Sequence, residues 1–279
     1  MSTATTPTPG PTPGPATGPT TRPLDLEGTS GISFATLVKV ELRKSYDTRA
    51  GLWLLLVTAG LTALAMVIVL VVTAVQDVSI SFGGFLATTA YTSSFLLPVL
   101  GIMLVTSEWS QRTAMTTFTL EPHRGRVLVA KLVAGLLLAL AVAVVAVAAA
   151  VVSNLVYGLV SGDASWALGG VSLPGFLVVQ AVAMLIGFAF ATLMLNTAVA
   201  IVVYFFYSFV LPVLFELAAN FIGWFADLRP WIDFNQAQTP LFDWSVNGSE
   251  WGHLLVSGLI WLVLPFTLGL WRVLRAEVK

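Results

Sequence analysis

The sequence predicts an all-α, polytopic membrane protein with six transmembrane helices, an N-terminal amphipathic helix in the membrane interface, and both termini in the cytoplasm. Three observations support this fold class. Charged residues make up only 10% of the 279 residues, long stretches lack them entirely, and the basic residues gather on one side of those stretches. A helix needs about 20 mainly apolar residues to cross the hydrocarbon core of a bilayer, and these stretches are long enough.

Six segments meet this length requirement. They are residues 51–75, 83–106, 131–155, 175–195, 198–219 and 252–271. The fourth and fifth segments belong to one apolar run, in which Asn196 and Thr197 are expected to form the hairpin. No water is available inside the bilayer to satisfy open backbone groups, so we expect these segments to be helical. A β-barrel would require polar and apolar residues to alternate, and residues 132–152 show no alternation.

Lys and Arg predict the orientation, because cytoplasmic loops of membrane proteins carry an excess of both. If the amino terminus lies in the cytoplasm, Arg229 alone among the 13 basic residues falls on the outer side. The opposite orientation would place nearly all of them outside, and we reject it. The net charge of −1 hides this asymmetry and gives no reason to expect a nucleic acid as a partner.

The chain is expected to have two parts. Residues 1–32 begin with a stretch rich in Pro, Thr and Gly, which cannot bury enough apolar surface to fold, so we expect a disordered cytoplasmic tail. The tail lacks the basic start and apolar middle of a signal peptide. Residues 33–279 form the six-helix transmembrane domain.

Residues 34–49 are expected to form the amphipathic helix in the interface. Its apolar side consists of Phe34, Leu37, Val38 and Leu42. Glu41 falls on this apolar side, where a carboxylate needs a partner. Two interpretations stay open, and they are compatible: the helix anchors the chain, or it braces a partner with Glu41 held in a salt bridge.

The loop after the second span is the strongest candidate for a functional segment. It lies on the cytoplasmic side and carries apolar side chains that water would contact unless a partner covers them. A short helix is expected over residues 110–120, and Pro122 should end it, because the residue before a proline disfavours the helical conformation. The apolar residues of the loop are Met115, Phe118 and Leu120.

This arrangement resembles the permease subunits of type-two ATP-binding-cassette (ABC) exporters over about residues 33–279. The loop is similar to the family pattern E…T…L-x-x-P…R…K, and the matching residues are Glu108, Thr113, Leu120, Pro122, Arg124 and Lys131. Two departures stand out: Leu120 and Pro122 are two apart, and Arg112 precedes Thr113 where glycine is common in the family.

The resemblance implies that the loop is a coupling helix that contacts a separate ATP-binding subunit. It places the contact at residues 112–120, with Glu41 and Glu108 as bracing carboxylates. The residues so assigned are Glu41, Glu108, Arg112, Thr113, Met115, Phe118, Leu120, Pro122 and Arg124. It further implies a bacterial cytoplasmic membrane, a second copy of this chain or a homologous permease as partner, and surrounding membrane lipid.

The chain is not expected to be an enzyme. A phosphate-binding loop requires G-x-x-x-x-G-K-[ST], and no lysine follows a glycine anywhere in the sequence. ATP and Mg²⁺ are therefore expected on the partner ATPase, with no cofactor bound by this chain. The absence of cysteine and the two separated histidines give no reason to expect a metal site.

Three residues are candidates for the substrate path. Glu216 is the only acidic residue inside a predicted span, and an ionisable group in a membrane is a functional candidate by default. Pro212 lies one turn earlier and is expected to kink the helix. Gln180 is a weaker candidate.

Three alternative functions remain open. A secondary transporter would need coupling carboxylates near the midplane of the membrane. Glu216 is a single carboxylate about one turn from the end of its span, which does not meet this requirement well. A non-transporting membrane scaffold is compatible with the same pattern. An intramembrane hydrolase would need a serine nucleophile and a histidine base; His253 and Ser257 are one turn apart, but the segment lacks the leading glycine of the rhomboid motif.

Overall fold

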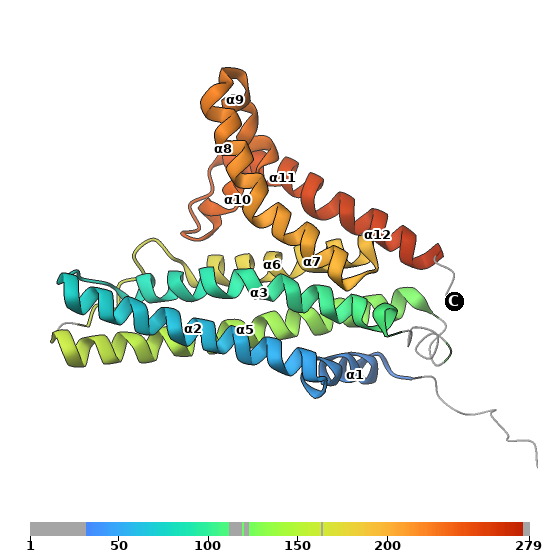
Figure 1. Ribbon diagram of the computed structural model, residues 1–279, viewed down its shortest axis with the longest axis horizontal. Coiled ribbons are helices and arrows are strands. Elements are labelled where there is room, and N and C mark those ends of the chain that lie inside the picture. Colours follow the sequence, from blue (N-terminus) through green and yellow to red (C-terminus); the bar gives the residue numbers. More distant parts are fainter. Residues whose placement is uncertain (1–31, 112–118, 120–122, 163, 276–279) are drawn as a thin grey trace, which may run out of the picture. The chain divides into compact units, whose positions relative to one another are not determined.

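The structure is a computed structural model that describes residues 32–111, 119, 123–162 and 164–275. Contacts divide the chain into Met1–Gly31 and Ile32–Lys279, and the helices described belong to the second unit (Figure 1). The predicted tail 1–32 therefore lies outside the described residues except for Ile32.

Six helices are long and apolar enough to cross a membrane, which confirms the predicted all-α class and number of spans in the described part of the chain. They are α2 (Arg49–Gln76), α3 (Phe82–Ser110), α5 (Arg124–Ser161), α6 (Leu173–Met194), the stretch Thr197–Phe221 and the stretch Gly248–Arg275. The predicted hairpin also occurs: α6 ends at Met194, Leu195 adopts a left-handed conformation, and Asn196 caps the next helix.

Most of these helices extend beyond the predicted spans. The largest difference is at α5, which begins at Arg124 rather than at residue 131. Hydropathy marks the part of a helix that can lie in hydrocarbon, whereas the helix itself continues until a cap or a helix-breaking residue ends its hydrogen bonds. The first turns of α5 contain Arg124 and Arg126, and they therefore escape an analysis based on apolar length.

The amphipathic helix α1 spans Phe34–Asp47. The side chain of Ser33 caps its first turn, and Thr48 both follows α1 and caps the start of α2. Val38 and Glu41 are its buried residues, so the face that packs on the bundle is the predicted apolar face with the carboxylate in it. Helix α1 and the end of α12 (Leu264–Arg275) lie at the same end of the bundle (Figure 1); the side of the membrane remains a prediction.

Helices α3 and α6 form the centre of the bundle. The most apolar windows of these two helices are 61% and 67% buried, against 17% for α2 and for Thr197–Phe221. Their backbones approach closely at Gly187 of α6, where an added Cβ would overlap the carbonyl of Pro98 in α3. Pro98 cannot donate a hydrogen bond to Ser94 four residues earlier. The hydroxyl of Tyr204 supplies this bond instead, at 3.0 Å.

Two of the spanning stretches contain a π-helical turn. Phe206–Val210 joins α7 (Thr197–Phe205) to α8 (Leu211–Phe221), and Leu259–Val263 joins α11 (Gly248–Gly258) to α12. Each turn is followed by a proline, Pro212 or Pro265, which cannot continue the α-helical hydrogen bonds. At the predicted site of a kink the structure thus has a π-helical turn, a recognised cause of helix bending.

Short helices connect α8 to α11 (Figure 1). They are α9 (Gly223–Ile232), α10 (Phe234–Ala237) and a 3₁₀ turn at Thr239–Leu241. Two hydrogen bonds attach them to the π-helical turns: the Trp261 indole donates to the Ile232 carbonyl at 2.7 Å, and the Asn235 amide donates to the Tyr207 carbonyl at 3.3 Å. The rings of Tyr207 and Trp261 lie 5.0 Å apart. The two π-helical turns therefore contact each other at the place where the short helices bind them.

The close approach of α3 and α6 generates the first prediction. Gly187→Ala should lower the free energy of unfolding by about 1–3 kcal/mol, because the added methyl group forces the two backbones apart. Gly60→Ala is the matched control, since nothing lies within 4 Å of a Cβ there. It should be neutral or slightly stabilising. Thermal unfolding of both variants in mild detergent tests this, and equal melting temperatures would contradict it.

Candidate functional site

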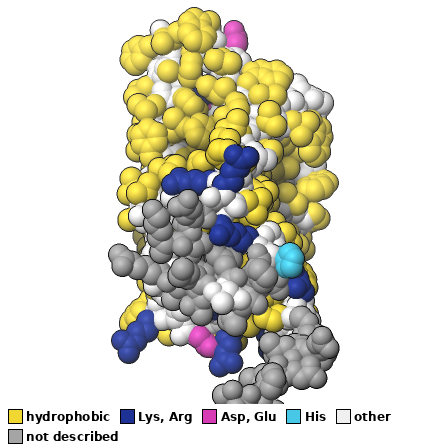
Figure 2. All heavy atoms as spheres, turned by 90° about the vertical axis from the view of Figure 1, so that its right-hand side faces the viewer, with side chains coloured by type: hydrophobic (Ala, Val, Ile, Leu, Met, Phe, Trp, Pro, Cys, Tyr) yellow, Lys and Arg dark blue, Asp and Glu magenta, His cyan; other side chains and the backbone are white. Residues whose placement is uncertain are grey.

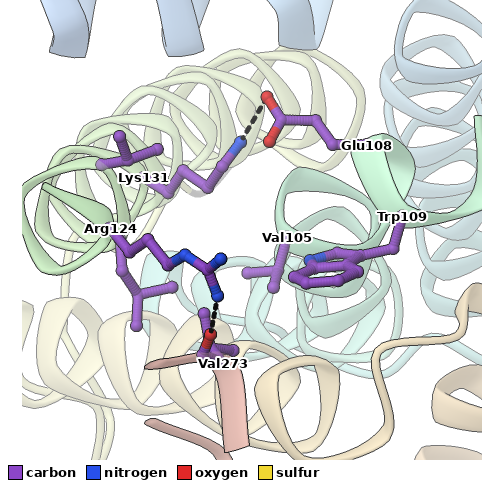
Figure 3. A pocket seen from close by; sticks show the side chains of 8 residues that line it. Val105, Glu108, Trp109, Arg124, Lys131 and Val273 are labelled. Atoms are coloured by element: carbon purple, nitrogen blue, oxygen red, sulfur yellow. Dashed lines mark hydrogen bonds and ion pairs between the residues drawn. The ribbon is translucent and has the colours of Figure 1, made fainter. Parts of the chain in front are cut away.

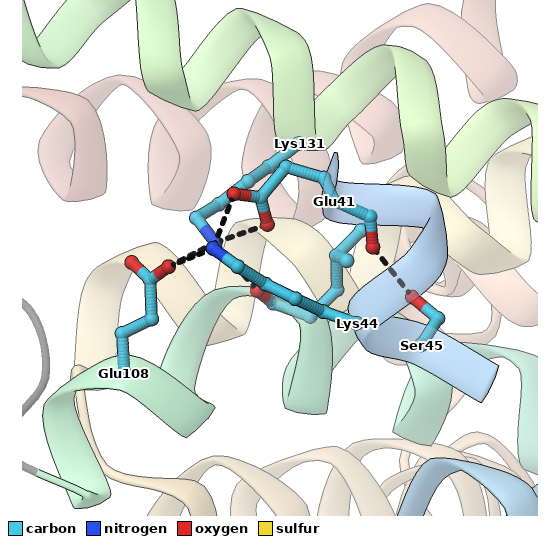
Figure 4. A network of polar contacts seen from close by, with 6 residues as sticks. Glu41, Lys44, Ser45, Glu108 and Lys131 are labelled. Carbon is cyan, nitrogen blue, oxygen red and sulfur yellow. Dashed lines mark hydrogen bonds and ion pairs between the residues drawn. The ribbon is translucent and has the colours of Figure 1, made fainter. Parts of the chain in front are cut away.

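The candidate site is a cluster of four charged side chains (Figure 4). It lies where α1 meets the last turn of α3 and the first turns of α5, and we call this the basic end of the bundle. Lys131 lies 2.6 Å from one oxygen of Glu41 and 3.2 Å from Glu108. Lys44 lies 2.7 Å from the other oxygen of Glu41 and 2.6 Å from the same oxygen of Glu108. Each carboxylate therefore accepts from both ammonium groups, and we call this set the charge cluster.

The charge cluster is largely removed from solvent. The side chains of Glu41, Glu108 and Lys131 are only 4%, 7% and 5% exposed, and Lys44 is the exception at 39%. An isolated charge at such a depth would be very costly, and two carboxylates with two ammonium groups make the set neutral. Lys44 is thus the one member of the charge cluster that a ligand or a partner can readily contact.

Three different helices supply the members. Glu41 lies on the buried face of α1, Glu108 in the last turn of α3, and Lys131 two turns into α5. A carboxylate near the carboxyl end of a helix is unfavourable, because the helix dipole is negative there. The two cations offset this at Glu108, and Lys131 also donates to the Leu104 carbonyl at 3.2 Å. The cluster therefore attaches α1 to both ends of the α3–α5 connection.

The environment of Lys44 shifts its acidity. Partial burial by itself would lower the pKa of the ammonium group, but the attraction of Glu41 and the hydrogen bond and charge of Glu108 outweigh burial. The pKa of Lys44 is therefore raised above its ordinary value, and the group stays charged throughout the physiological range.

Arg124 links the start of α5 to the last spanning helix. Its guanidinium donates to the Val273 carbonyl at 3.3 Å, beside Val105 and Trp109 of α3 (Figure 3). The hollow between these residues has a volume of about 10 Å³, which is close to the smallest space that holds one water molecule. The position of Arg124 therefore favours a structural contact between α5 and α12 over a ligand pocket.

Six of the predicted coupling residues lie outside the described residues, namely Arg112, Thr113, Met115, Phe118, Leu120 and Pro122. Figure 2 shows the end of the bundle at which α3 ends and α5 begins, and several Lys and Arg side chains lie on the face in view. The structure brings together Glu41 and Glu108, which were predicted as bracing carboxylates, through their ion pairs with Lys131. Arg124 lines the small hollow of Figure 3 together with Glu108 and Lys131.

The three candidate residues of the substrate path do not converge. Glu216 forms an ion pair with Arg229 of α9, and Arg229 also lies 3.3 Å from the buried Asp233. Pro212 lies in the first turn of α8, directly after the π-helical turn. Gln180 is buried between α6 and α3, and its amide donates to the Ser93 hydroxyl at 2.5 Å. Glu216 and Gln180 thus contact different elements, α9 and α3, and their contacts do not join them in one path.

Sequence reasoning missed the cationic half of the charge cluster. Lys131 belongs to the family pattern without an assigned role, and no role is predicted for Lys44 from the sequence. The available signal was the need of Glu41 for a partner, since Lys44 follows it by three residues and thus lies on the same helix face. Nothing in the sequence indicated that Lys131, 90 residues away, supplies the buried partner.

Removal of one cation should show how strongly the charge cluster holds these helices. Lys131→Met should lower the free energy of unfolding by about 3–5 kcal/mol, because it leaves a buried carboxylate without its cation. The double variant Glu41→Gln/Lys131→Met keeps the cluster neutral and should recover part of this loss. Arg43→Met breaks an exposed ion pair of the same helix and should leave unfolding unchanged. Chemical denaturation in detergent measures all three, and equal losses in the single and double variants would contradict the account.

The raised pKa of Lys44 predicts a loss of stability in alkali. A group whose pKa is higher in the folded state contributes stability that is complete below its unfolded pKa and declines as the pH rises through the folded one. Stability should therefore fall as the pH increases above about 10.4. In Lys44→Arg the decline should be smaller, because the guanidinium stays charged. Unfolding curves between pH 8 and about 11 test this, and identical pH profiles would refute it.

No protein-family model matches the chain. No curated protein matches it either.

Proposed function

We propose that this chain is the membrane-spanning permease subunit of an ATP-driven ABC exporter, which forms the substrate path and couples to a separate ATP-binding subunit. The observation that carries the proposal is the charge cluster. It ties α1 to the last turn of α3 and the early turns of α5, the two helices that enter and leave the connection proposed as the coupling helix.

The arrangement supports a mechanical role for this connection. A force applied between residues 111 and 123 acts on Glu108 and Lys131 at once, because an ion pair joins them. Through Lys131 and Lys44 it also acts on Glu41, so α1, α3 and α5 would move as one body. Helix α3 packs along α6 at the centre of the bundle, and a displacement would thereby reach the interior of the membrane domain.

In this proposal ATP binds to the partner chain, with Mg²⁺, and the permease binds no cofactor. Two ATP-binding subunits would close on each other and push the connection of each permease. The free energy that shifts the permease between inward- and outward-facing states would come from the difference in ATP affinity between them. The basic end of the bundle would face the cytoplasm of a bacterial cell, in agreement with the excess of Lys and Arg there.

A second permease chain would complete the path. Helix α2 and the stretch Thr197–Phe221 are each only 17% buried over their most apolar window and carry many exposed apolar side chains. A second copy or a homologous permease would cover part of these faces, and lipid the remainder. The proposed path would lie between the two copies.

The coupling contact generates a test with two loop variants. The permease would be co-expressed with the ATP-binding-cassette subunit that co-purifies with it. Phe118→Ala and Arg112→Ala should each lower the permease-stimulated ATPase rate at least about tenfold, the effect of losing roughly 1.4 kcal/mol of contact free energy. Leu159→Ala is the control, because Leu159 is 87% exposed and lies at the end of α5 that is far from the loop.

Three outcomes would contradict the proposed function. They are the absence of any ATP-binding subunit after purification in mild detergent, loop variants with unchanged ATPase rates, and transport that persists without ATP when a proton gradient is supplied. The last outcome would favour a secondary transporter.

A further inference from the structure

A cavity of about 600 Å³ lies between α1, the start of α2, α3 and α5. Its volume falls within the range of about 300–1,000 Å³ that is typical of ligand sites. The deeper walls are apolar and include Leu100, Met103 and Leu104 of α3. The exposed residues Val40 and Ala50 also line it, so the cavity is open at one side.

The cavity extends along α3 from the level of the membrane interface into the predicted span. Gln111 lines one end and Leu100 the other, and eleven residues of helix correspond to about 16 Å along α3. About 9 Å of this length lies within the span predicted to end at residue 106, and the remainder is level with the interfacial helix α1. The cavity therefore has room for a headgroup at the interface and for part of an acyl chain along α3.

The mouth of the cavity is polar. Lys44, Ser45 and Thr48 line it together with the carboxylates Glu41 and Glu108, whose charges Lys44 and Lys131 neutralise. Lys44 is the exposed member of the charge cluster. An ammonium group has three N–H donors, and among the described residues two of them serve Glu41 and Glu108, which leaves one for a ligand. Helix α2 begins beside Thr48 with Arg49, and its first turn supplies both a positive charge and the positive end of a helix dipole.

We propose that this cavity binds one anionic phospholipid from the leaflet at the basic end of the bundle. One acyl chain would lie against Leu100 and Met103, and the phosphate would lie at the mouth beside Lys44 and the first turn of α2. A soluble peptide is a poorer fit, because the six helices are long and apolar enough to cross a membrane and would place the deep part of the cavity inside the bilayer. The bound lipid would fill the gap between α1 and the bundle, and α1 would thereby report the composition of that leaflet to the charge cluster.

The proposal does not depend on the proposed function, because lipid binding requires neither ATP nor an ATPase. Native mass spectrometry of the full chain tests it, after extraction in mild detergent that contains equal amounts of palmitoyl-oleoyl phosphatidylglycerol and phosphatidylcholine. The wild type should retain one phosphatidylglycerol per chain, with about a fivefold preference over phosphatidylcholine, the effect expected for one favourable basic residue.

Two matched variants locate the site. Val40→Trp should abolish retention, because the indole fills the open side of the cavity at a position where valine is 44% exposed. Val129→Trp should retain the lipid as the wild type does, since Val129 is 50% exposed on α5 but does not line the cavity. Equal retention by both variants, or equal loss from both, would overturn the proposal.

A comparison of chain lengths keeps the proposal testable if Val40→Trp does not fold. Diheptanoyl phosphatidylglycerol has the same headgroup, but it should compete only weakly for the wild-type protein, because each buried methylene strengthens binding about fourfold. Equal competition by the short and the long lipid would show headgroup binding without the cavity and would overturn the proposal. Equal retention of phosphatidylcholine and phosphatidylglycerol would likewise overturn the assignment to an anionic lipid.

Discussion

The packing of α1 on the bundle depends on the neutralisation of two buried carboxylates by two lysines. Glu41 and Glu108 are almost fully buried, where an isolated charge is very costly, and Lys131 between them is as deeply buried as they are. Each of these groups makes the burial of the others possible. The result is a joint of three helices in which the charge cluster lies beside a buried apolar cluster of Val38, Leu104, Ala130 and Ala134. Removal of one charge would leave its partner buried and unpaired, so the two lysines and the two carboxylates are retained together.

The rest of the bundle solves a related problem, which is how to satisfy backbone groups that prolines leave open in an apolar surrounding. The carbonyl of Ser94 loses its helical partner to Pro98, and Tyr204 from another helix replaces it. The π-helical turn Phe206–Val210 before Pro212 follows the same logic, because the Asn235 amide of the neighbouring short helix α10 donates to the Tyr207 carbonyl. Irregular backbone at these depths is tolerated where protein groups satisfy it. The prolines therefore act as points of attachment between helices.

Sequence reasoning succeeded where the physics is local. The length of apolar runs predicted six spans, and the polar pair Asn196 and Thr197 inside one of these runs predicted the hairpin, where the Asn196 side chain caps the next helix. The conflict between Glu41 and its apolar surroundings predicted that this residue needs a partner. The identity of that partner depends on which helices pack together, and a single sequence does not contain this information. The same limitation applies to Gln180, whose contact with Ser93 exists only because α6 packs on α3.

The distance in sequence between the members of the charge cluster has a consequence for biosynthesis. Lys131 follows Glu41 by 90 residues, and Glu108 follows Lys44 by 64. At about 5–20 residues per second, a ribosome needs about 5–18 seconds to make the segment between Glu41 and Lys131. During this time the buried partner of Glu41 does not yet exist, so α1 would lie in the membrane interface. Completion of the third span closes the cluster, and this gives the assembly of the amino-terminal half a defined final step.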